Sequence, residues 1–489
     1  MEANKPKLDR KDAVDAQSIV SIKACDDVQA VANTFQSDAE KRLVRKVDLT
    51  LMPTIWVLYL FSYADRTNIG NAKVAGMTAD LGMSSGQYSL ALVVFFISYI
   101  VFEVPSNLVL SKTRPSIYLP IIMTLWGTIT CTMGAVKSPG ALYAVRFMLG
   151  VLEAGFAPGV MLILSSWYKP HEQAKRFSIF YSAAVISGAF GGIVAGGISG
   201  SLDGAHGIAG WRWLFVWHRI LRINYSELTW NPDRGRGATI ACALIAVFIL
   251  PDYPATTKRF TPEERTLAVE RLEMNNVVIS TEERTPLSSL EALRGSLTNW
   301  RTWIMTAGYT AIGGSATMSY FYPTLVAEMG YSSTMAEYMV VPIYAVAFFA
   351  VLTTGYLNDK IPNYRGLIIA GWLTISMICS IIICTVYNLK ARYVFLVFMA
   401  SGLLSSNASS LAYSSSTFAS MPQETRAVSL AFVNGISGIS QIYGAYLFPD
   451  TDAPKYLMGF AVISALSAAS VGIYTLAHIL IRKYPHPNP

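Results

Sequence analysis

Repeated apolar stretches of about 20 residues constrain the fold of this chain more than any other feature of its sequence. A helix of about 20 residues spans about 30 Å, the thickness of the hydrocarbon core of a bilayer. The chain has 489 residues, of which 53% are hydrophobic and only 14% are charged. A soluble domain has about a quarter of its residues charged. The composition therefore predicts an all-α integral membrane protein.

The apolar stretches predict twelve transmembrane helices, six before and six after a polar central loop. The predicted spans are 47–69, 86–109, 117–136, 141–166, 177–201, an interrupted sixth, 301–327, 335–357, 365–387, 391–413, 427–447 and 456–481. Twelve spans bring both termini to one side, and the basic residues of the short loops place that side in the cytoplasm. The net charge of +7 follows the same loops, so it does not indicate nucleic-acid binding. We expect the protein in the plasma membrane.

The domain organisation follows from these spans. We predict a disordered cytoplasmic tail over 1–46, a six-helix bundle over 47–250, a cytoplasmic linker over 251–300, a second six-helix bundle over 301–481 and a cytoplasmic tail over 482–489. Thr261, Pro262 and Glu264 predict a short surface helix in the linker, because they supply a cap, a first-turn proline and a capping-box acid. The stretch from Asp80 to Ser84 echoes the stretch from Glu328 to Ser332, as expected of parallel repeats.

The sixth span is interrupted by residues 217–237, which include four arginines. The apolar run that follows, 238–250, is only about 20 Å long as a helix and is too short to cross. Joining it directly to Trp211–Val216 gives a span of ordinary length. We therefore hypothesise that 217–237 is an insertion, translated from an unspliced intron. The alternative is an amphipathic re-entrant segment, although its arginines argue against contact with lipid.

The fourth span carries two charges inside its apolar run, Arg146 and Glu153. A charge at membrane depth costs several kcal/mol, so such residues normally face a water-filled cavity. Their spacing of seven residues is close to two helical turns, which puts both side chains on roughly one face. Gly155 and Pro158 follow and allow the helix to bend there. This span is expected to form one wall of a transport pathway.

Several motifs of the chain resemble one known family. They are YADRTNIGNAKVAGM at 63–77, FEVPSNL at 102–108, RFMLGVLEAGFAPGV at 146–160, SSWYKPHEQAKR at 165–176 and GWRWLF at 210–215. In combination they resemble the major facilitator superfamily and, within it, the fungal anion:cation symporter group of allantoate, nicotinate, pantothenate and biotin permeases. The resemblance implies two six-helix bundles that rock about a midplane site. The loop SKTRPS after the second span departs from the acidic-basic-glycine pattern of the superfamily's gating loop.

Arg146 is the first candidate for binding an anionic substrate, because a guanidinium stays charged and can hold a carboxylate with two hydrogen bonds. Glu153 is the first candidate for the coupling proton, since substrate bound to the arginine would favour protonation of a nearby carboxylate. The alternative is that Arg146 and Glu153 pair only to lock helices. At the end of the first span, Asp65 and Arg66 are further candidates for proton coupling and substrate binding, or are merely solvated. As neighbours, they face different directions.

The second half is expected to supply uncharged substrate contacts from Tyr322, Asn407 and Asn434, through stacking on the aromatic ring and hydrogen bonds from the amides. The alternative for each amide is a structural hydrogen bond between helices. Gating is assigned to residues at the cytoplasmic ends of the second and eighth spans and in the loops that follow. These residues are Glu103, Lys112, Arg114, Asp359, Lys360 and Arg365. Glu103 is expected to form an inner-gate network with the basic loop.

These features predict a secondary active transporter that imports a small organic anion, a vitamin-like monocarboxylate or an allantoate-type compound, together with protons. The alternatives are a proton-driven exporter of a secondary metabolite or toxic compound, and a nontransporting nutrient sensor. No phosphate loop or metal-ligand spacing occurs in the sequence, so we predict neither an enzyme, a cofactor nor a metal site. The expected partners are the anion, protons and lipid, without nucleic acid, and the protein is expected to be monomeric.

Overall fold

The structure is a computed structural model that describes residues 10–201, 207, 209–216, 238–275, 277–278, 287–331, 333–386, 388–444, 446–448, 452–453 and 455–484. All regular secondary structure in these ranges is helical. The hypothesised insertion, 217–237, lies outside the described residues.

The described residues of the first half form nine α-helices and one 3-10 turn. They are α1 (Arg10–Val74), α2 (Met77–Asp80), α3 (Ser85–Lys112), α4 (Pro115–Met133), α5 (Pro139–Glu153), α6 (Phe156–Trp167), η1 (Pro170–Glu172), α7 (Gln173–Ser201), α8 (Gly210–Val216) and α9 (Ala238–Ile249). The linker carries α10 (Pro262–Glu273) and α11 (Ser289–Leu297). Thr261 caps α10 and forms the expected capping box with Glu264.

The second half contains eight α-helices and two 3-10 turns among the described residues. They are α12 (Trp300–Ala316), η4 (Thr317–Phe321), α13 (Tyr322–Ala327), α14 (Ser333–Lys360), η5 (Pro362–Tyr364), α15 (Arg365–Thr385), α16 (Leu389–Thr417), α17 (Gln423–Ser437), α18 (Ile439–Gly444) and α19 (Leu457–Lys483). The seventh and eleventh predicted spans are therefore each interrupted, after Ala316 and after Ser437.

Eight stretches of the described residues are long and apolar enough to cross a membrane. They are Asp38–Lys73, Gly86–Lys112, Pro115–Met133, Pro139–Trp167, Tyr338–Lys360, Pro362–Thr385, Leu389–Thr417 and Leu457–Lys483. The remaining predicted spans correspond to α7 and to three pairs of shorter helices, α8 with α9, α12 with α13, and α17 with α18. The all-α fold with two six-helix bundles agrees with the prediction.

The chain divides into two compact units, Met1–Leu49 and Thr50–Pro489. The described residues of the first unit, from Arg10 onward, belong to α1. The stretch from Arg10 to Leu49 contains neither glycine nor proline, the two residues least compatible with a helix interior. Its polar composition alone had suggested disorder.

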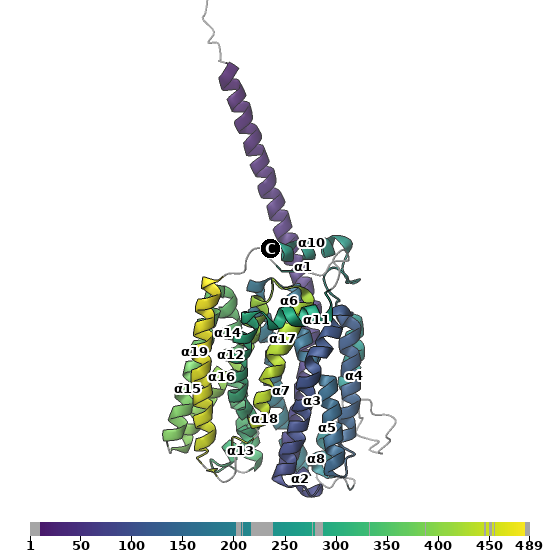
Figure 1. Cartoon of the computed structure of the whole chain (residues 1–489), viewed down its shortest axis with the longest axis vertical. Coiled ribbons are helices and arrows are strands. Elements are labelled where there is room, and N and C mark those ends of the chain that lie inside the picture. Colours follow the sequence, from purple (N-terminus) through teal and green to yellow (C-terminus); the bar gives the residue numbers. More distant parts are fainter. Residues whose placement is uncertain are drawn as a thin grey trace, which may run out of the picture. The chain divides into compact units, whose positions relative to one another are not determined.

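The second unit, Thr50–Pro489, contains both bundles. Figure 1 shows α10 and α11 at one end of these bundles, which we call the linker end, and α2, α8 and α13 at the opposite end. Two extensive helix pairs join the bundles, α7 with α14 and α3 with α17. Within the first bundle, α3 also packs along α5. The helices α3, α5 and α17 position most of the candidate site.

Polarity in this unit is arranged as a bilayer requires, with large apolar side chains outside and charged ones inside. On α4, the exposed side chains Ile117, Ile121 and Leu125 follow one another at four-residue steps, so they form an outward-facing stripe. Glu103 and Arg146 are instead 0% and 1% exposed. Buried charges beneath an apolar surface are typical of helices that face lipid and enclose a polar pathway.

Candidate functional site

The centre of the first bundle holds an ion pair between α1 and α5. Arg66 donates from Nη2 and Nε to Oε1 of Glu153, at 2.8 and 3.1 Å. Ser62, one helical turn before Arg66, donates to the same oxygen at 3.0 Å. Glu153 is 1% exposed, while the Arg66 side chain keeps 18% of its surface accessible. The three donors stabilise an ionised Glu153, and the arginine remains reachable.

The second oxygen of Glu153, Oε2, accepts no hydrogen bond from the described residues. This atom is therefore available to take a proton without first losing a hydrogen bond. A carboxylate that is held at one oxygen and unoccupied at the other can change its protonation state with little rearrangement. This chemistry is what a proton carrier requires.

An aromatic frame on α3 holds the two arginines of the site. The guanidinium of Arg66 lies 4.8 Å from the ring centre of Tyr99 and 5.6 Å from that of Phe95. Arg146 lies 4.5 Å from the same Phe95 ring and donates to the Ala91 carbonyl at 3.4 Å. Cation–π contacts in a desolvated site contribute about 2 kcal/mol. Phe95 is thus a contact shared by both guanidinium groups.

The close approach of α5 to α3 depends on Gly150, which lies between Arg146 and Glu153 on α5. A Cβ atom at Gly150 would lie 2.4 Å from the carbonyl oxygen of Phe95, so no larger residue fits without movement. The predicted bend also occurs, because α5 ends at Glu153 and α6 begins at Phe156. Arg146 and Glu153 are both buried, but Glu153 pairs with Arg66 of α1.

Asp65 and Arg66 lie in different environments, as their adjacent positions on a helix predict. Asp65 is 1% exposed and accepts a hydrogen bond from the indole Nε1 of Trp126 at 3.3 Å. The Trp126 ring in turn packs edge-on against Phe156, with ring centres 5.2 Å apart. Neither residue is therefore merely solvated at a membrane interface. Asp65 lies on the α4 side of α1, whereas Arg66 reaches α5.

The three second-half candidates occupy separate positions. Asn434 donates to Oε1 of Glu103 at 2.7 Å and contacts the Tyr99 hydroxyl at 3.5 Å, so it reaches the first bundle. Asn407 accepts a hydrogen bond from the Tyr309 hydroxyl at 2.9 Å. Tyr322 is buried and packs edge-on against Tyr344. Asn434 is thereby connected through Tyr99 to the arginine cluster.

The gating candidates divide into two groups. Asp359 accepts hydrogen bonds from the backbone amides of Ala174 and Lys175 at 2.9 and 2.8 Å and pairs with Arg365 at 3.2 Å. Asp359 thereby caps the N-terminus of α7 from the other bundle, where a negative charge is favourable. Lys112 instead donates to Ser289 of the linker at 3.1 Å. Arg114 and Lys360 have exposed side chains.

The expected network of Glu103 with the basic loop differs from the contacts of the described residues, among which no hydrogen bond or ion pair joins Glu103 to Lys112 or Arg114. The hydrogen-bond donor to Glu103 among the described residues is Asn434, which lies 331 positions away in the sequence. Sequence analysis also missed Arg426, which is fully buried and donates to Ser166 of the other bundle at 3.2 Å. Its position one residue before the predicted eleventh span, 427–447, had placed it in a loop.

Hydrogen bonds between the bundles extend from the level of Tyr99 toward the linker end. Asn107 donates to the Ala427 carbonyl at 3.0 Å, and Gln423 donates to the Ser111 carbonyl at 3.2 Å. Both donors are buried. The linker end of the α3–α17 pair is therefore closed in this structure.

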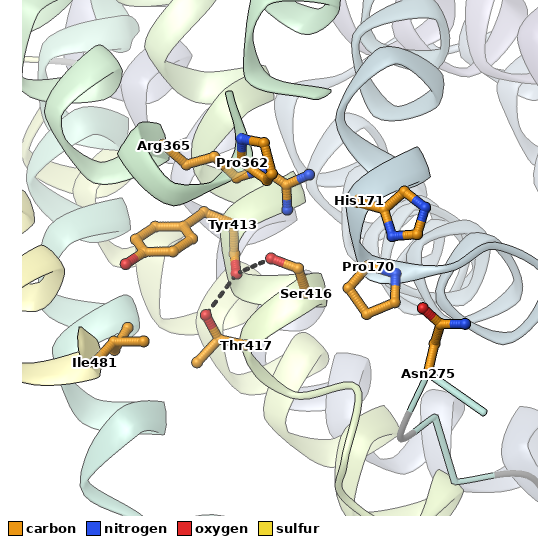
Figure 2. Close-up of a pocket in the computed structure, with 9 residues that line it drawn as sticks. All are labelled: Pro170, His171, Asn275, Pro362, Arg365, Tyr413, Ser416, Thr417 and Ile481. Atoms are coloured by element: carbon orange, nitrogen blue, oxygen red, sulfur yellow. Dashed lines mark hydrogen bonds between the residues drawn. The ribbon is translucent and has the colours of Figure 1, made fainter. Parts of the chain in front are cut away.

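A cavity of about 280 Å³ is lined by nine residues, and neither Arg66 nor Glu153 is among them. Figure 2 shows these nine residues. The walls of the cavity come from the η1 turn, the loop before α15, the end of α16, the linker and α19. Ser416 and Thr417 both donate to the Tyr413 carbonyl there, at 3.0 and 2.7 Å. None of its nine lining residues contacts Glu153, so the cavity does not contain the candidate coupling site.

Comparisons with known proteins agree with this architecture. The sequence profile of the Major Facilitator Superfamily matches residues 55–220 and 237–445. The MFS-type transporter cnsO of Penicillium expansum is 34% identical over 465 residues, which cover 92% of this chain and 85% of that protein. A putative tartrate transporter of Agrobacterium vitis is 31% identical over 318 residues, covering 64% of this chain and 67% of that protein.

Among solved structures, a proton:xylose symporter superposes with a TM-score of 0.62 at 12% identity, covering 89% of this chain and 96% of that chain. A bacterial homologue of the human lysosomal transporter Spinster, in an inward-facing conformation, gives a TM-score of 0.59 at 17% identity, covering 89% and 98%. At these identities the superpositions establish the fold. With the sequence matches, they show that the chain belongs to the Major Facilitator Superfamily of membrane transporters.

Proposed function

We propose that the protein imports a small organic anion together with protons, and that Arg66 and Glu153 couple the two. The observation that carries this proposal is the buried ion pair in which Arg66 donates twice to one oxygen of Glu153. A substrate carboxylate competes with Glu153 for the guanidinium, because both are planar anions with matching acceptor geometry. Glu153 then loses its partner while it remains buried.

A buried carboxylate without a cationic partner is costly, so Glu153 takes up a proton when the substrate displaces it. The anion and the proton are thus bound in the same step. Release of the substrate on the other side returns Arg66 to Glu153 and expels the proton. In this cycle Arg66 takes the role that sequence analysis gave first to Arg146, while Arg146 adds a second positive charge next to the same Phe95 ring.

The substrate class follows from this chemistry. A cationic site bounded by the rings of Phe95 and Tyr99 suits a carboxylate with a compact organic body, as in a vitamin-like monocarboxylate or an allantoate-type compound. The similarity to a protein described as a putative tartrate transporter also favours a carboxylate. The motif resemblance to the fungal anion:cation symporter group supports the same class. We place the protein as a monomer in the plasma membrane with both termini in the cytoplasm.

The insertion hypothesis for 217–237 forms part of this proposal. The family profile stops at residue 220 and resumes at 237, so the unmatched interval lies entirely within the hypothesised insertion. This interval supports the removal of those residues from the mature message. Sequencing of transcripts tests the hypothesis directly, since uniform retention of the 217–237 codons contradicts it.

The transport proposal is tested by uptake in yeast that lacks its own vitamin and allantoate permeases. The chain is expressed with and without codons 217–237 and offered nicotinate, pantothenate, biotin, allantoate and tartrate at acidic and neutral external pH. We expect uptake of one anion that increases on acidification and disappears in Glu153→Gln. The matched control is Glu328→Gln, at an exposed glutamate outside the site. Lowered accumulation of a loaded compound would replace import by export, and binding without flux would indicate a sensor.

A further inference from the structure

A second buried carboxylate, Glu103, lies where the two bundles meet. It is 0% exposed and comes from α3 of the first bundle. Asn434 of α17 donates to its Oε1 at 2.7 Å, and Oε2 accepts no hydrogen bond from the described residues. The next residue on α17 is Gly435, where a Cβ atom would lie 3.1 Å from Oε2. Glu103 is therefore enclosed by the opposite bundle.

Among the described residues, no cation is hydrogen-bonded to Glu103 or forms an ion pair with it. Asn434 on α17 supplies a neutral amide, and the ionisable groups that interact with Glu103 electrostatically are Arg66 on α1, Tyr99 on α3 and Tyr309 on α12. Arg66 is already hydrogen-bonded to Glu153. Among the described residues, the hydrogen-bond donor to Glu103 is thus the neutral amide of Asn434.

In the described part of the chain, the other helices packed against α3 do not supply a charged donor to Glu103 either. On α5, Arg146 lies against Phe95 and Glu153 is held by Arg66. On α6 there is no ionisable side chain, and the Tyr443 hydroxyl of α18 lies against Gly314 of α12. The arginine of α17, Arg426, contacts Ser166 and the Ala419 carbonyl, two helical turns before Asn434.

An ionised carboxylate in such a setting is unfavourable. Burial of a charge costs several kcal/mol even after relaxation unless it is paired and hydrogen-bonded, and one neutral amide does not compensate for that cost. The neutral acid loses far less, because a buried hydroxyl without an acceptor costs about 1–3 kcal/mol. The closed contact between α3 and α17 is therefore compatible with the neutral form of Glu103.

We propose that Glu103 is a second proton-binding site of this transporter, occupied while α3 and α17 are in contact at the linker end and emptied when they separate. The proposal rests on the proposed function for its alternating-access cycle, but not on Glu153 as the carrier. Glu103, Asn107 and Ser111 follow at four-residue steps along α3, and all three contact α17. Separation at the linker end breaks the contact at Ser111 first, then the one at Asn107 and finally the one at Glu103. Water then reaches Glu103.

Once hydrated, Glu103 is ionised at neutral pH like any carboxyl group in water. It must then bind a proton again before the contact with α17 can reform. The proton of Glu103 is thus released on the side where the linker lies, and its rebinding permits closure. This role explains why an acid is placed at a contact that two amides could make.

The test measures closure without requiring a known substrate. The five native cysteines are replaced, and Ser111→Cys, at a side chain 7% exposed, reports opening through its rate of labelling by a maleimide. Each labelling rate is divided by that of the same cysteine in denatured protein at the same pH, because only the thiolate reacts and its fraction rises with pH. We expect this ratio to rise with pH, by up to about tenfold per pH unit for one titrating group. In Glu103→Gln the pH dependence should disappear and labelling should stay slow. The proposal is overturned if Glu103→Gln labels with the same pH dependence as its parent.

Two further measurements separate this inference from the proposed function. In Glu153→Gln, anion uptake should be lost while the pH dependence of Ser111→Cys labelling remains, so the two acids are distinguished. If no organic anion is transported but Glu103→Gln abolishes the pH dependence, the inference stands and the proposed function fails. If Glu103→Gln does not fold, infrared spectroscopy replaces the labelling test. The purified full chain and its Glu153→Gln variant should both show a protonated carboxyl group at neutral pH. Its absence from both proteins contradicts the inference.

Discussion

Glu153 and Glu103 are two carboxylates of nearly equal burial, 1% and 0% exposed, in very different surroundings. Glu153 receives two hydrogen bonds from a guanidinium and one from a hydroxyl, all within the first bundle. Glu103 receives one from an amide of the opposite bundle. The first environment favours an anion and the second a neutral acid. Burial alone thus does not decide the protonation state of a carboxyl group in the membrane. The hydrogen-bond donors around the group also decide it.

The difference also separates what each acid can respond to. The partner of Glu153 is a cation that a substrate can also bind, so this acid responds to occupancy of the site. The partner of Glu103 lies on the other bundle, so this acid responds to the distance between α3 and α17. A transporter that uses both would link proton binding to substrate at one residue and to conformation at the other.

The largest expected effect follows from removing the cation beside Glu153. Arg66→Ala leaves a buried carboxylate without its partner, which costs about 3–5 kcal/mol of stability, and it removes the proposed substrate contact. We expect a lower Tm and loss of anion uptake. In Arg66→Ala combined with Glu153→Gln, the Tm should recover while uptake stays absent. Recovery of uptake in the double variant would contradict the role of Arg66 in substrate binding.

A smaller effect is expected when Glu153 is made permanently neutral. Glu153→Gln keeps the size of the side chain and a carbonyl acceptor for Arg66, so folding should be retained. The variant should exchange labelled anion across the membrane but fail to accumulate it against a gradient, because no proton is released with the substrate. Counterflow and pH-driven uptake in proteoliposomes measure the two activities. Accumulation equal to that of the unmodified chain argues against Glu153 as the proton carrier.

The cap on α7 provides a third test, at the linker end. Asp359→Asn removes the negative charge that accepts the Ala174 and Lys175 amides. A charge at a helix N-terminus contributes about 0.3–1 kcal/mol, so closure should weaken and Ser111→Cys should be labelled roughly twofold to fivefold faster. Glu328→Gln, far from this contact, should leave labelling unchanged. If the labelling rate is unchanged in Asp359→Asn, the cap on α7 does not contribute to closure, and the contacts between α3 and α17 alone hold the linker end closed.

The smallest effect concerns Asp80, a loop acid remote from both buried carboxylates. Hydrogen bonds from Trp211 and Arg212, together with the Arg212 charge, lower the pKa of Asp80. A lowered folded-state pKa contributes stability that is present above the unfolded value, near 3.9, and is lost as pH falls through the folded value. Since the Asp80 side chain is 41% exposed, Asp80→Asn should cost under about 1 kcal/mol at neutral pH. The Tm difference from the parent should shrink in acid; a constant difference contradicts this explanation.

Much of the fold could be predicted because hydropathy marks long helices that face lipid. The prediction of 365–387 is close to Arg365–Thr385, and 86–109 lies within Ser85–Lys112. The interruptions after Ala316 and Ser437 were missed. They occur beside glycines that approach neighbouring helices, such as Gly313 against Ser437 and Gly438 against Ile100. Local sequence does not specify such contacts, because they depend on the packed partner.

The candidate site shows the same limit. The seven-residue spacing predicted that Arg146 and Glu153 lie on one face of a single span, and the structure shows both buried in α5. It gave no information about Arg66, whose contact with Glu153 crosses 87 positions and depends on how α1 packs against α5. The contact between Glu103 and Asn434 crosses 331 positions and both bundles. Charge at membrane depth identified the important residues, and only the packed structure paired them.

The account depends most directly on coupling between Glu153 and substrate, which simultaneous recording of anion and proton entry into proteoliposomes can test. Purified chain without residues 217–237 is reconstituted with a pH-sensitive dye inside and offered the anion identified by uptake in yeast. We predict that anion entry is accompanied by internal acidification, and that Glu153→Gln shows anion exchange without acidification. Acidification of equal size in Glu153→Gln, or anion entry without any proton in the parent, would contradict the account.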